Sequence, residues 1–520
     1  MKFKISFLSI ILFGIFGFGQ IQQQFTVDEN GRLNFNKIQV ESNHYWDSNV
    51  FGPSDLELDW SSPDFDVSDN PSVDSWDTHL AISPDNSVNI VYNDNHSNGL
   101  QKIMYRKKTG DEWSAPIYVD AGGEIGGRNN HMPVVSAAPN GDIHVIYTVW
   151  AYANFRNYMG YSHYDAASDT WSDGVKISDV EGTIEMNGIN ALYSTENSQP
   201  VAIWGYDNRE DANVEEIYMT YFDGENWSED IAVSQLSDGL SAYGPAVTGI
   251  GNQKAIIIYR EYIDGSSNEL RYRIYDEVSH ELSDPKTVDF GVHPVYYLPL
   301  LYHDGKANIL FTYKTGGQEF VKIAEYNSDS DSFFVKDDSK QFPDNTLRRY
   351  GWDCNQDGDC GIIFTDLIGE KVSYMAYSPD SGFSDALTIV NQDPQIDPPF
   401  AGFDSFGNLH ITWSDMRFDT GGSFIHREIF YKEGKNLNMG VNDILNSEIQ
   451  FYPNPSNGKF TIRTDRPGVI ELFDLNGKKL ENRRIQKITN LELSLPDGVY
   501  VLKFNDGKQI QTKKILIKNN

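Results

Sequence analysis

The sequence NHMPVVSAAPNGDIHVIY, from Asn130 to Tyr147, decides the fold. It predicts a strand, a tight Pro-Asn-Gly-Asp turn and a second strand in which apolar residues alternate with polar ones. Two other stretches have the same pattern, HLAISPDNSVNIVY at 79–92 and FAGFDSFGNLHITW at 400–413. Versions of this pattern return about every fifty residues, which indicates an internal repeat.

A second repeated phrase lies between these hairpins. It consists of a Tyr-containing strand, a short turn and the pair Trp-Ser, as in MYRKKTGDEWSAPIYV, YSHYDAASDTWSDGVKI and MTYFDGENWSEDIAV. Four-stranded units at this period are typical of β-propeller blades. We therefore expect an all-β fold, with a seven-bladed β-propeller over residues 74–434. Its inner hairpins are expected to begin near His79, His131, Met186, Tyr243, Tyr296, Tyr350 and Pro398.

Residues 20–73 bear on the number of blades. This segment is rich in Asp, Ser and Asn, so we expect an irregular segment that packs on the propeller or closes a blade. Six blades, or eight, are the alternative counts.

Residues 1–19 combine two lysines, an apolar core and small residues near their end, which predicts a secretory signal peptide. Residues 435–450 are expected to form a polar linker.

The charge of the chain is strongly negative and unevenly distributed. The 520 residues carry a formal charge of −33, but residues 451–520 carry +6 and the remainder therefore −39. A body this acidic lacks the basic surface that nucleic acids require, although a few arginines in a funnel can still bind an anionic substrate. No segment after the signal peptide approaches the roughly 20 apolar residues of a membrane-spanning helix. We expect an exported monomer without a transmembrane segment.

Residues 451–520 predict a small β-sandwich, because short alternating strands are separated by Asn-Gly and Asp-Gly turns. Four motifs occur in order: FYPNP at 451–455, LNG at 475–477, GVY at 498–500 and KILIK at 514–518. Together they resemble the C-terminal sorting domain of type IX secretion. This resemblance implies the type IX secretion machinery as a partner, and a secreted or cell-surface location.

The two cysteines of the chain, Cys354 and Cys360, lie in the sequence WDCNQDGDCGIIF. The NQDGD turn aligns with the Pro-Asn-Gly-Asp turns of the other hairpins, so the cysteines should face each other and form a disulfide in an exported protein. The same stretch has the spacing of a calcium loop, but Phe364 occupies the place of the required Glu. A structural calcium ion is therefore the alternative, and no other cofactor is predicted.

Candidate functional residues lie where the innermost strands begin or where the second strands end, because these positions meet at one mouth of a propeller. Aromatic faces stack on sugar rings, while guanidinium and amide groups bind carboxylates and hydroxyls. We predict His131 and Tyr243 as catalytic residues. The predicted substrate-binding residues are Arg128, Asn130, Arg260, His79, Asn95 and Tyr206. This set suits β-elimination from a uronic acid, in which one group binds the carboxylate, a base removes the adjacent proton and an acid protonates the leaving oxygen.

The Arg128/His131 and Tyr243/Arg260 pairs resemble the ulvan-lyase families. The resemblance implies that His131 is the base or acid, Tyr243 its partner, and Arg128 and Arg260 the carboxylate-binding residues. It implies a lyase acting on an acidic polysaccharide. A second funnel histidine expected by that resemblance is absent, because positions 110 and 111 are Gly and Asp.

Two other classes of function remain open. A sialidase-like exo-glycosidase would use Arg128, Arg260 and Arg417 as a carboxylate-binding triad, and a non-catalytic propeller would bind or adhere to a glycan. His144 and His410 lie in the middle of strands at corresponding positions of two repeats. We assign both to packing or to hydrogen bonds between blades.

Overall fold

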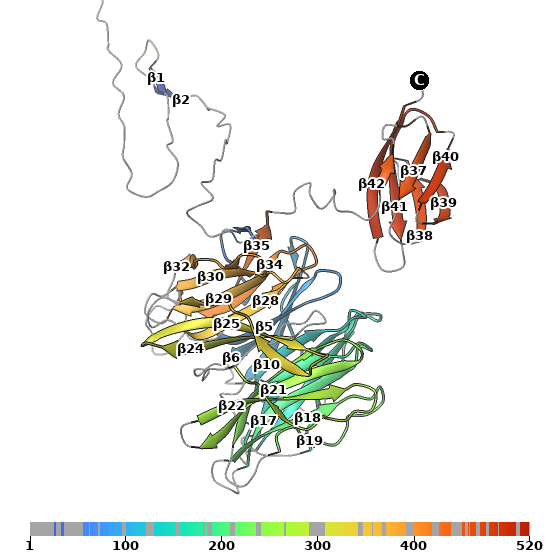
Figure 1. The fold of residues 1–520 in the computed structure, drawn as a ribbon. Coiled ribbons are helices and arrows are strands. Elements are labelled where there is room, and N and C mark those ends of the chain that lie inside the picture. The colour runs from blue at the N-terminus through green and yellow to red at the C-terminus, as the bar shows by residue number, and fades with distance from the viewer. Residues whose placement is uncertain are drawn as a thin grey trace, which may run out of the picture. The chain divides into compact units, whose positions relative to one another are not determined.

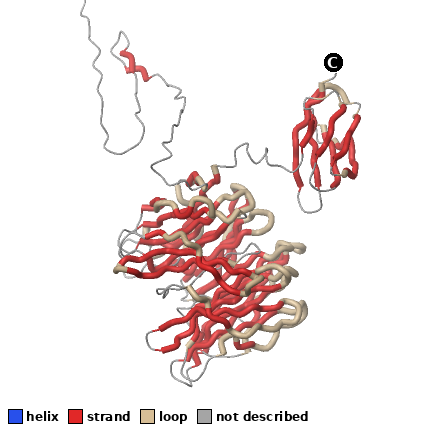
Figure 2. The backbone as a smooth tube through the Cα atoms, viewed as in Figure 1, coloured by secondary structure: helices blue, strands red, loops and turns tan. Residues whose placement is uncertain are grey.

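The computed structural model describes most of the chain between residues 56 and 518. The described residues are 25–27, 33–35, 56–61, 63–70, 73–95, 100–120, 129–151, 156–179, 183–184, 190–208, 214–235, 241–264, 267–290, 307–341, 347–355, 357–366, 371–391, 399–418, 426–437, 450–452, 456, 458–463, 468–474, 478–486, 488–493, 495–505 and 510–518. All the regular elements among them are β-strands (Figure 2), which confirms the all-β prediction for this part of the chain. The predicted signal peptide at 1–19 lies outside it.

Seven antiparallel sheets, numbered here in chain order, occupy residues 58–436 (Figure 1). Sheet 1 contains β5 (Asp74–Ile82), β6 (Val88–Asn95), β7 (Gln101–Thr109), β8 (Glu112–Trp113) and β9 (Ile117–Tyr118). Sheet 2 contains β10 (Asn129–Ala137), β11 (Ile143–Ala151), β12 (Arg156–Asp165), β13 (Thr170–Trp171) and β14 (Val175–Lys176). Sheet 3 contains β15 (Thr183–Ile184), β16 (Ala191–Ser194), β17 (Pro200–Asn208), β18 (Val214–Tyr221) and β19 (Ile231–Ala232).

The other four sheets repeat this plan. Sheet 4 contains β20 (Ala242–Gly249), β21 (Lys254–Asp264), β22 (Ser267–Asp276) and β23 (Lys286–Thr287). Sheet 5 contains β24 (Asn308–Thr315), β25 (Gln318–Asn327), β26 (Ser332–Val335) and β27 (Lys340–Gln341). Sheet 6 contains β28 (Leu347–Cys354), β29 (Cys360–Asp366), β30 (Lys371–Ser378), β31 (Gly382–Phe383) and β32 (Leu387–Asn391). Sheet 7 contains β33 (Phe400–Phe403), β34 (Leu409–Asp415), β35 (Glu428–Asn436), β3 (Leu58–Trp60) and β4 (Phe65–Asp66).

The predicted Pro-Asn-Gly-Asp hairpin turn is present between β10 and β11. The backbone N–H of Ala138 donates to the carbonyl of Asp142 at 2.8 Å, and Gly141 has a φ of 95° that favours glycine. The turn at Asn355–Asp359 has the same hydrogen bond, also at 2.8 Å. Cys354 and Cys360 face each other across this hairpin and form a disulfide, which confirms the predicted pairing.

Large buried aromatic side chains hold neighbouring sheets together. One occupies the same place in β6, β11, β17, β21, β24, β29 and β34, and each packs against the sheet before it. These residues are Tyr92, Tyr147, Trp204, Tyr259, Phe311, Phe364 and Trp413, all at most 3% exposed. Tyr92 of sheet 1 packs with Ile429 and Tyr431 of sheet 7, so the last sheet contacts the first. Burial of such rings is the main apolar contribution to each interface.

The Trp-Ser phrase of the sequence has a structural cause. Each serine accepts a hydrogen bond from the backbone of the third long strand of its sheet and so pins the outer strand to it. Ser114 Oγ accepts from the Lys107 N–H at 3.0 Å, and Ser172 Oγ accepts from the His163 N–H at 3.0 Å. Ser228, Ser283 and Ser384 make the same contact.

The segment predicted to be irregular, 20–73, contains two strands that complete sheet 7. β3 and β4 both pair with β35, so residues 58–66 of this segment include regular strands that extend sheet 7. Phe65-Asp-Val-Ser68 matches the outer segments Ile117–Asp120, Val175–Ser178 and Ile231–Ser234. Its serine Oγ accepts the Ile429 N–H at 3.0 Å, just as Ser178 and Ser234 accept N–H groups in their own sheets. β35 continues to Asn436, so the predicted boundary at 434 falls inside a strand.

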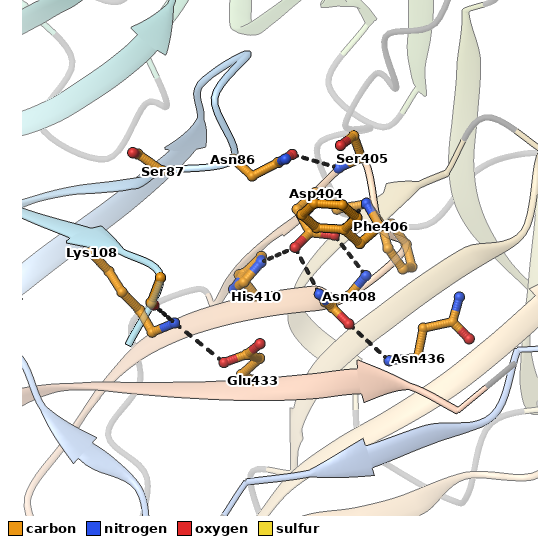
Figure 3. A network of polar contacts seen from close by, with 12 residues as sticks. Asn86, Ser87, Lys108, Asp404, Ser405, Phe406, Asn408, His410, Glu433 and Asn436 are labelled. Atoms are coloured by element: carbon orange, nitrogen blue, oxygen red, sulfur yellow. Dashed lines mark hydrogen bonds and ion pairs between the residues drawn. The ribbon is translucent and has the colours of Figure 1, made fainter. Parts of the chain in front are cut away.

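Polar contacts also join sheets 1 and 7 (Figure 3). The Asn86 side chain accepts the backbone N–H of Ser405 at 2.8 Å, and Lys108 Nζ lies 3.3 Å from a carboxylate oxygen of Glu433. Arg106 is buried and donates to the carbonyl of Val67 at 2.7 Å. Arg273 makes the equivalent contact between sheets 4 and 3, at 3.0 Å to the carbonyl of Val233. The interface between the last and first sheets is therefore built like those within the series.

The C-terminal residues form two sheets around a core of their own. One contains β36 (Gln450–Tyr452), β37 (Lys459–Arg463) and β40 (Ile488–Glu492), and the other contains β38 (Gly468–Phe473), β39 (Lys479–Ile485), β41 (Gly498–Asn505) and β42 (Ile510–Ile517). Phe460 and Ile462 of the first sheet share a buried cluster with Leu472, Leu502 and Phe504 of the second. Two antiparallel sheets over one core are a β-sandwich. β1 (Phe25–Val27) and β2 (Leu33–Phe35) form a separate two-stranded sheet.

A charge introduced at Val67 should destabilise the seven sheets. Val67 is 0% exposed in the cluster between sheets 7 and 1, whereas Val175, in an outer strand of sheet 2, is 39% exposed. We expect Val67→Asp to lower the free energy of unfolding by about 3 kcal/mol or more, and Val175→Asp to lower it by less than about 1 kcal/mol. Urea unfolding followed by tryptophan fluorescence reports on this part of the chain, because all 10 tryptophans precede residue 414. Equal effects of the two substitutions would contradict the assigned role of residues 65–68.

Candidate functional site

A β-bulge interrupts the first strand of several sheets near its start. The register shifts between Trp76 and His79, between His131 and Val134, and between Tyr243 and Ala246. A residue with positive φ lies inside each bulge: Asp77, Met132 and Gly244. Bulges re-aim side chains and are enriched next to active sites. Trp76, His131 and Tyr243 each form the last register pair before the bulge, so they occupy equivalent positions at the same end of sheets 1, 2 and 4.

His131 is a buried, neutral imidazole at this position. Its side chain packs edge-on against Trp150 with ring centroids 5.1 Å apart, and the residue is 8% exposed. Burial lowers the pKa of His131 to about 4, so the ring is neutral near pH 7. Its Nε2 has no hydrogen-bond partner. An unpartnered buried nitrogen costs about 1–3 kcal/mol, which a purely structural residue would avoid.

Tyr243 and Arg260 form a pair in sheet 4. They face each other in the register of β20 and β21, and the guanidinium carbon of Arg260 lies 5.5 Å from the centroid of the Tyr243 ring. Arg260 is 7% exposed. It directly follows the buried aromatic Tyr259, a place where the other six sheets have uncharged residues: Asn93, Thr148, Gly205, Thr312, Thr365 and Ser414. This buried cation is the feature that distinguishes sheet 4.

Not all of the other predicted site residues lie with His131, Tyr243 and Arg260. His79 lies after the bulge, three residues beyond the position equivalent to His131, and its ring packs 4.3 Å from that of Phe400 in sheet 7. Burial lowers its pKa to about 4. The structure therefore places His79 in a sheet interface, and Trp76 takes the place that the sequence repeat suggested for it.

Asn130 is fully buried in a network between sheets 1 and 2. Its side-chain NH2 group donates to Asp120 at 2.5 Å, and its backbone carbonyl accepts a hydrogen bond from the side-chain NH2 group of Asn93 at 3.0 Å. The amide group is thus committed to Asp120. Asn95 is exposed at the end of β6. Arg128, the side chain of Tyr206, and the hairpin starts at Met186 and Tyr296 lie outside the described residues.

Arg417 of the alternative carboxylate-binding triad is already neutralised. Its guanidinium group lies 2.5 Å from Asp415 and 2.8 Å from Asp64, and it stacks 3.7 Å from the Phe430 ring centroid. Two carboxylates balance its charge, so this arginine is poorly suited to bind a third.

His144 and His410 have the structural role predicted for them. His144 Nδ1 lies 2.7 Å from the Tyr161 hydroxyl and its Nε2 lies 3.2 Å from the Ser198 carbonyl in sheet 3. His410 Nδ1 lies 2.7 Å from the Tyr431 hydroxyl. His144 therefore joins sheets 2 and 3, whereas His410 packs and hydrogen-bonds within sheet 7.

A pair that the sequence reasoning missed lies at the start of β35. His426 Nε2 is 2.9 Å from a carboxylate oxygen of Glu428, which is 1% exposed. The sequence signal was the alternation His426-Arg-Glu428, which places both side chains on one side of a strand. The partner that fixes Glu428, Ser68, is far away in the chain and could not be inferred from that alternation.

The described residues provide no evidence for a metal site. They contain no group of three or more His, Cys, Asp or Glu side chains that could hold a metal ion. In the calcium-like turn, Asn355 Oδ1 accepts the N–H groups of Asp357 and Asp359 at 3.0 Å, and Asp353 accepts that of Phe403 at 2.7 Å.

Among the described residues there is no helix long and apolar enough to cross a membrane.

Comparison with known proteins identifies the C-terminal domain. Residues 450–518 match the family model of the secretion system C-terminal sorting domain. This domain directs the chain through type IX secretion to the cell surface or the extracellular space. No curated protein sequence matches the chain.

Similar solved structures include several carbohydrate-active enzymes. An α-L-arabinofuranosidase of Fusarium graminearum is 11% identical, with 74% of this chain and 99% of that chain covered and a TM-score of 0.43. A polysaccharide lyase described as an ulvan lyase is also 11% identical, with 72% of this chain and 94% of that chain covered and a TM-score of 0.42. A Dyadobacter fermentans protein of unknown function is 11% identical, with 72% of this chain and 98% of that chain covered and a TM-score of 0.40. These similarities are too weak to assign an activity to the chain.

The neutral state of His131 should contribute to acid sensitivity. Its pKa is lowered from 6.5 to about 4, so the unfolded chain binds this proton first as the pH falls, and stability decreases from about pH 6.5 to about pH 4. Between pH 7 and 4.5 we expect the wild-type protein to lose about 2 kcal/mol more unfolding free energy than His131→Gln does. Urea titrations at both pH values measure this difference. His79 and His144 are unchanged in the comparison, and equal losses would show that His131 is not buried in its neutral form.

Proposed function

We propose that residues 58–436 form a closed seven-bladed β-propeller that cleaves a uronic-acid-containing, ulvan-like polysaccharide by β-elimination. Three observations support the architecture: seven successive sheets, one aromatic-lined interface between each sheet and the next, and a further interface between the last and the first. In such a fold the ends of the sheets that carry His131, Tyr243 and Arg260 surround one mouth of the central channel.

The observation that carries the functional proposal is the Arg260–Tyr243 pair. Arg260 is the single charged residue at its position among the seven sheets, and it is buried where water screens it little. A guanidinium group in such a place binds a carboxylate more strongly than an exposed one does. His131 occupies in sheet 2 the place that Tyr243 occupies in sheet 4, so the base and the acid come from equivalent places, and the cation comes from the strand that pairs with the acid.

These groups account for each proton in the elimination. Arg260 pairs with the uronate carboxylate and so acidifies the proton at C5. Neutral His131 accepts that proton through Nε2, the C4–O bond breaks, and a C4–C5 double bond forms. The Tyr243 hydroxyl donates a proton to the departing oxygen, and solvent returns one to Tyr243 as His131 loses its own.

Two competing functions remain distinguishable from this one. A non-catalytic glycan-binding propeller is favoured by the low exposure of His131 and Arg260, which limits access to both. A sialidase-like glycosidase is disfavoured, because Asp64 and Asp415 neutralise Arg417. The glycosidase would release products different from those of a lyase, and the glycan-binding propeller would release none.

The lyase proposal predicts absorbance at about 235 nm, where conjugated unsaturated uronates absorb, when the protein is incubated with ulvan. We expect His131→Ala and Tyr243→Phe each to lower turnover about 100-fold, because each removes one proton-transfer step. His144→Ala is the matched control, since that histidine is buried but structural, and it should retain turnover if the variant folds. New reducing ends without absorbance would indicate a hydrolase, and binding without any product would indicate a glycan-binding protein.

Arg260 should act mainly on substrate engagement. Arg260→Met keeps the aliphatic length and removes the charge, so we expect kcat/KM to fall at least about tenfold. Arg271, in the same sheet, is paired with Glu261 and Glu269 at 3.0 Å, so Arg271→Met is the control and should change kcat/KM less than about threefold. Steady-state kinetics on ulvan measure both, and unchanged kinetics in Arg260→Met would return this arginine to a structural role.

A further inference from the structure

His426 and Glu428 form a polar pair that the proposed elimination does not use. His426 lies just before β35, and its Nε2 is 2.9 Å from Oε1 of Glu428. The His426 side chain is 20% exposed, whereas Glu428 is 1% exposed. Since Nε2 itself is buried, the exposed part of the ring lies away from the carboxyl. A partly exposed imidazole is therefore backed by a buried carboxyl group.

The carboxyl is fixed from its other side by the closing segment. The Ser68 hydroxyl donates to Glu428 Oε2, and Ser68 Oγ accepts the Ile429 N–H at 3.0 Å. Ser68 thus holds Oε2 by a hydrogen bond, whereas His426 Nε2 contacts Oε1 at 2.9 Å without the alignment of a hydrogen bond. A carboxyl group fixed in this way can orient the imidazole that contacts it.

The buried carboxyl is unusual for its position. It faces Asp415 in the register of β34 and β35, and the equivalent residues of the other sheets are all partly exposed: Lys102, Tyr158, Glu216, Glu269, Phe320 and Lys371. Burial raises the pKa of Glu428, which means that the ionised form is costly there. A neutral side chain would avoid this cost, so stability alone does not explain the residue.

The charged groups around the pair leave His426 as the main partner of Glu428. Asp66 of β4 adds negative charge nearby, and Asp415 of β34 is balanced by Arg417 at 2.5 Å. Arg427 turns to the other side of the strand, where it pairs with Asp74 at 2.7 Å and lies over the Trp76 ring at 4.7 Å. Arg427 therefore lies beside the first strand of sheet 1, while His426 and Glu428 lie on the opposite face of β35, at the same end of the sheets as His131 and Tyr243.

We propose that His426 is a further substrate-contacting residue, which hydrogen-bonds a sugar hydroxyl of the polysaccharide, and that Glu428 is its positioning residue. Contact of Nε2 with the carboxyl leaves Nδ1 as the ring nitrogen that accepts a hydrogen bond from the ligand. The inference rests on the proposed function for the nature of the ligand, but it requires binding alone and no elimination.

Substitutions that place an amide at one or the other ring nitrogen test this assignment. Asn places a polar atom near Nδ1, and Gln places one near Nε2. Isothermal titration calorimetry of the full chain with ulvan oligosaccharides measures Kd. We expect His426→Ala and His426→Gln to weaken binding about tenfold, the value of one hydrogen bond, and His426→Asn to retain most of the affinity. Glu428→Gln should weaken binding by less than His426→Ala does.

His163 provides the matched control. Its Nε2 lies 3.3 Å from Asp142 and its side chain is 30% exposed, but it belongs to the opposite end of sheet 2, near the Pro-Asn-Gly-Asp turn. His163→Ala should leave Kd unchanged. Unchanged Kd in His426→Ala would overturn the inference, and so would equal weakening by His426→Asn and His426→Ala.

The two proposals fail in different ways. Loss of turnover in His131→Ala with unchanged Kd in His426→Ala would retain the lyase and exclude the His426 site. Weakened binding in His426→Ala without any unsaturated product from the wild-type protein would retain the site and exclude the lyase. Absence of ulvan binding by the wild-type protein would overturn both.

Discussion

One large aromatic side chain per sheet, buried against the preceding sheet, is the contact on which the structure depends. Each of these rings fixes the strand that carries it, and so determines the depth and direction of the residues on either side of it in the sequence. The first of them, Tyr92, needs a sheet before it, and sheet 7 supplies one only because residues 58–68 complete its outer edge. The N-terminal segment is therefore part of the core and also the source of Ser68 at the His426 pair.

The same contact explains how the side chains of the candidate site are positioned. Tyr259 is anchored in the interface with sheet 3, so Arg260 next to it must point toward the opposite side of the strand. The bulges then turn the starts of the first strands, where His131 and Tyr243 lie. Because these side chains come from strands rather than loops, their positions follow from packing of the sheets and need no bound ligand.

Local patterns in the sequence predicted local structure well. The Pro-Asn-Gly-Asp turn, the Cys354–Cys360 disulfide and the roles of His144 and His410 all depend on residues close in the chain or on the repeat. The alignment of His79 with His131 failed, because sheets 1 and 2 carry the same bulge and His79 lies after it whereas His131 lies before it. Phe65-Asp-Val-Ser68 could have been recognised as an outer segment from its likeness to Ile231–Ser234. Contacts between distant segments, such as Ser68 with Glu428, produce no sequence pattern from which they could be predicted.

The negative charge of the body does not exclude an acidic polysaccharide as the ligand. Exposed carboxylates are screened by salt beyond a Debye length of about 8 Å, whereas a buried guanidinium group acts on a bound carboxylate through a medium of lower dielectric. Several carboxylates near this end are also already paired, as Asp74 is with Arg427 and Asp415 with Arg417. The local balance around Arg260 and Tyr243, rather than the net charge of the chain, therefore decides whether a uronate is held beside His131.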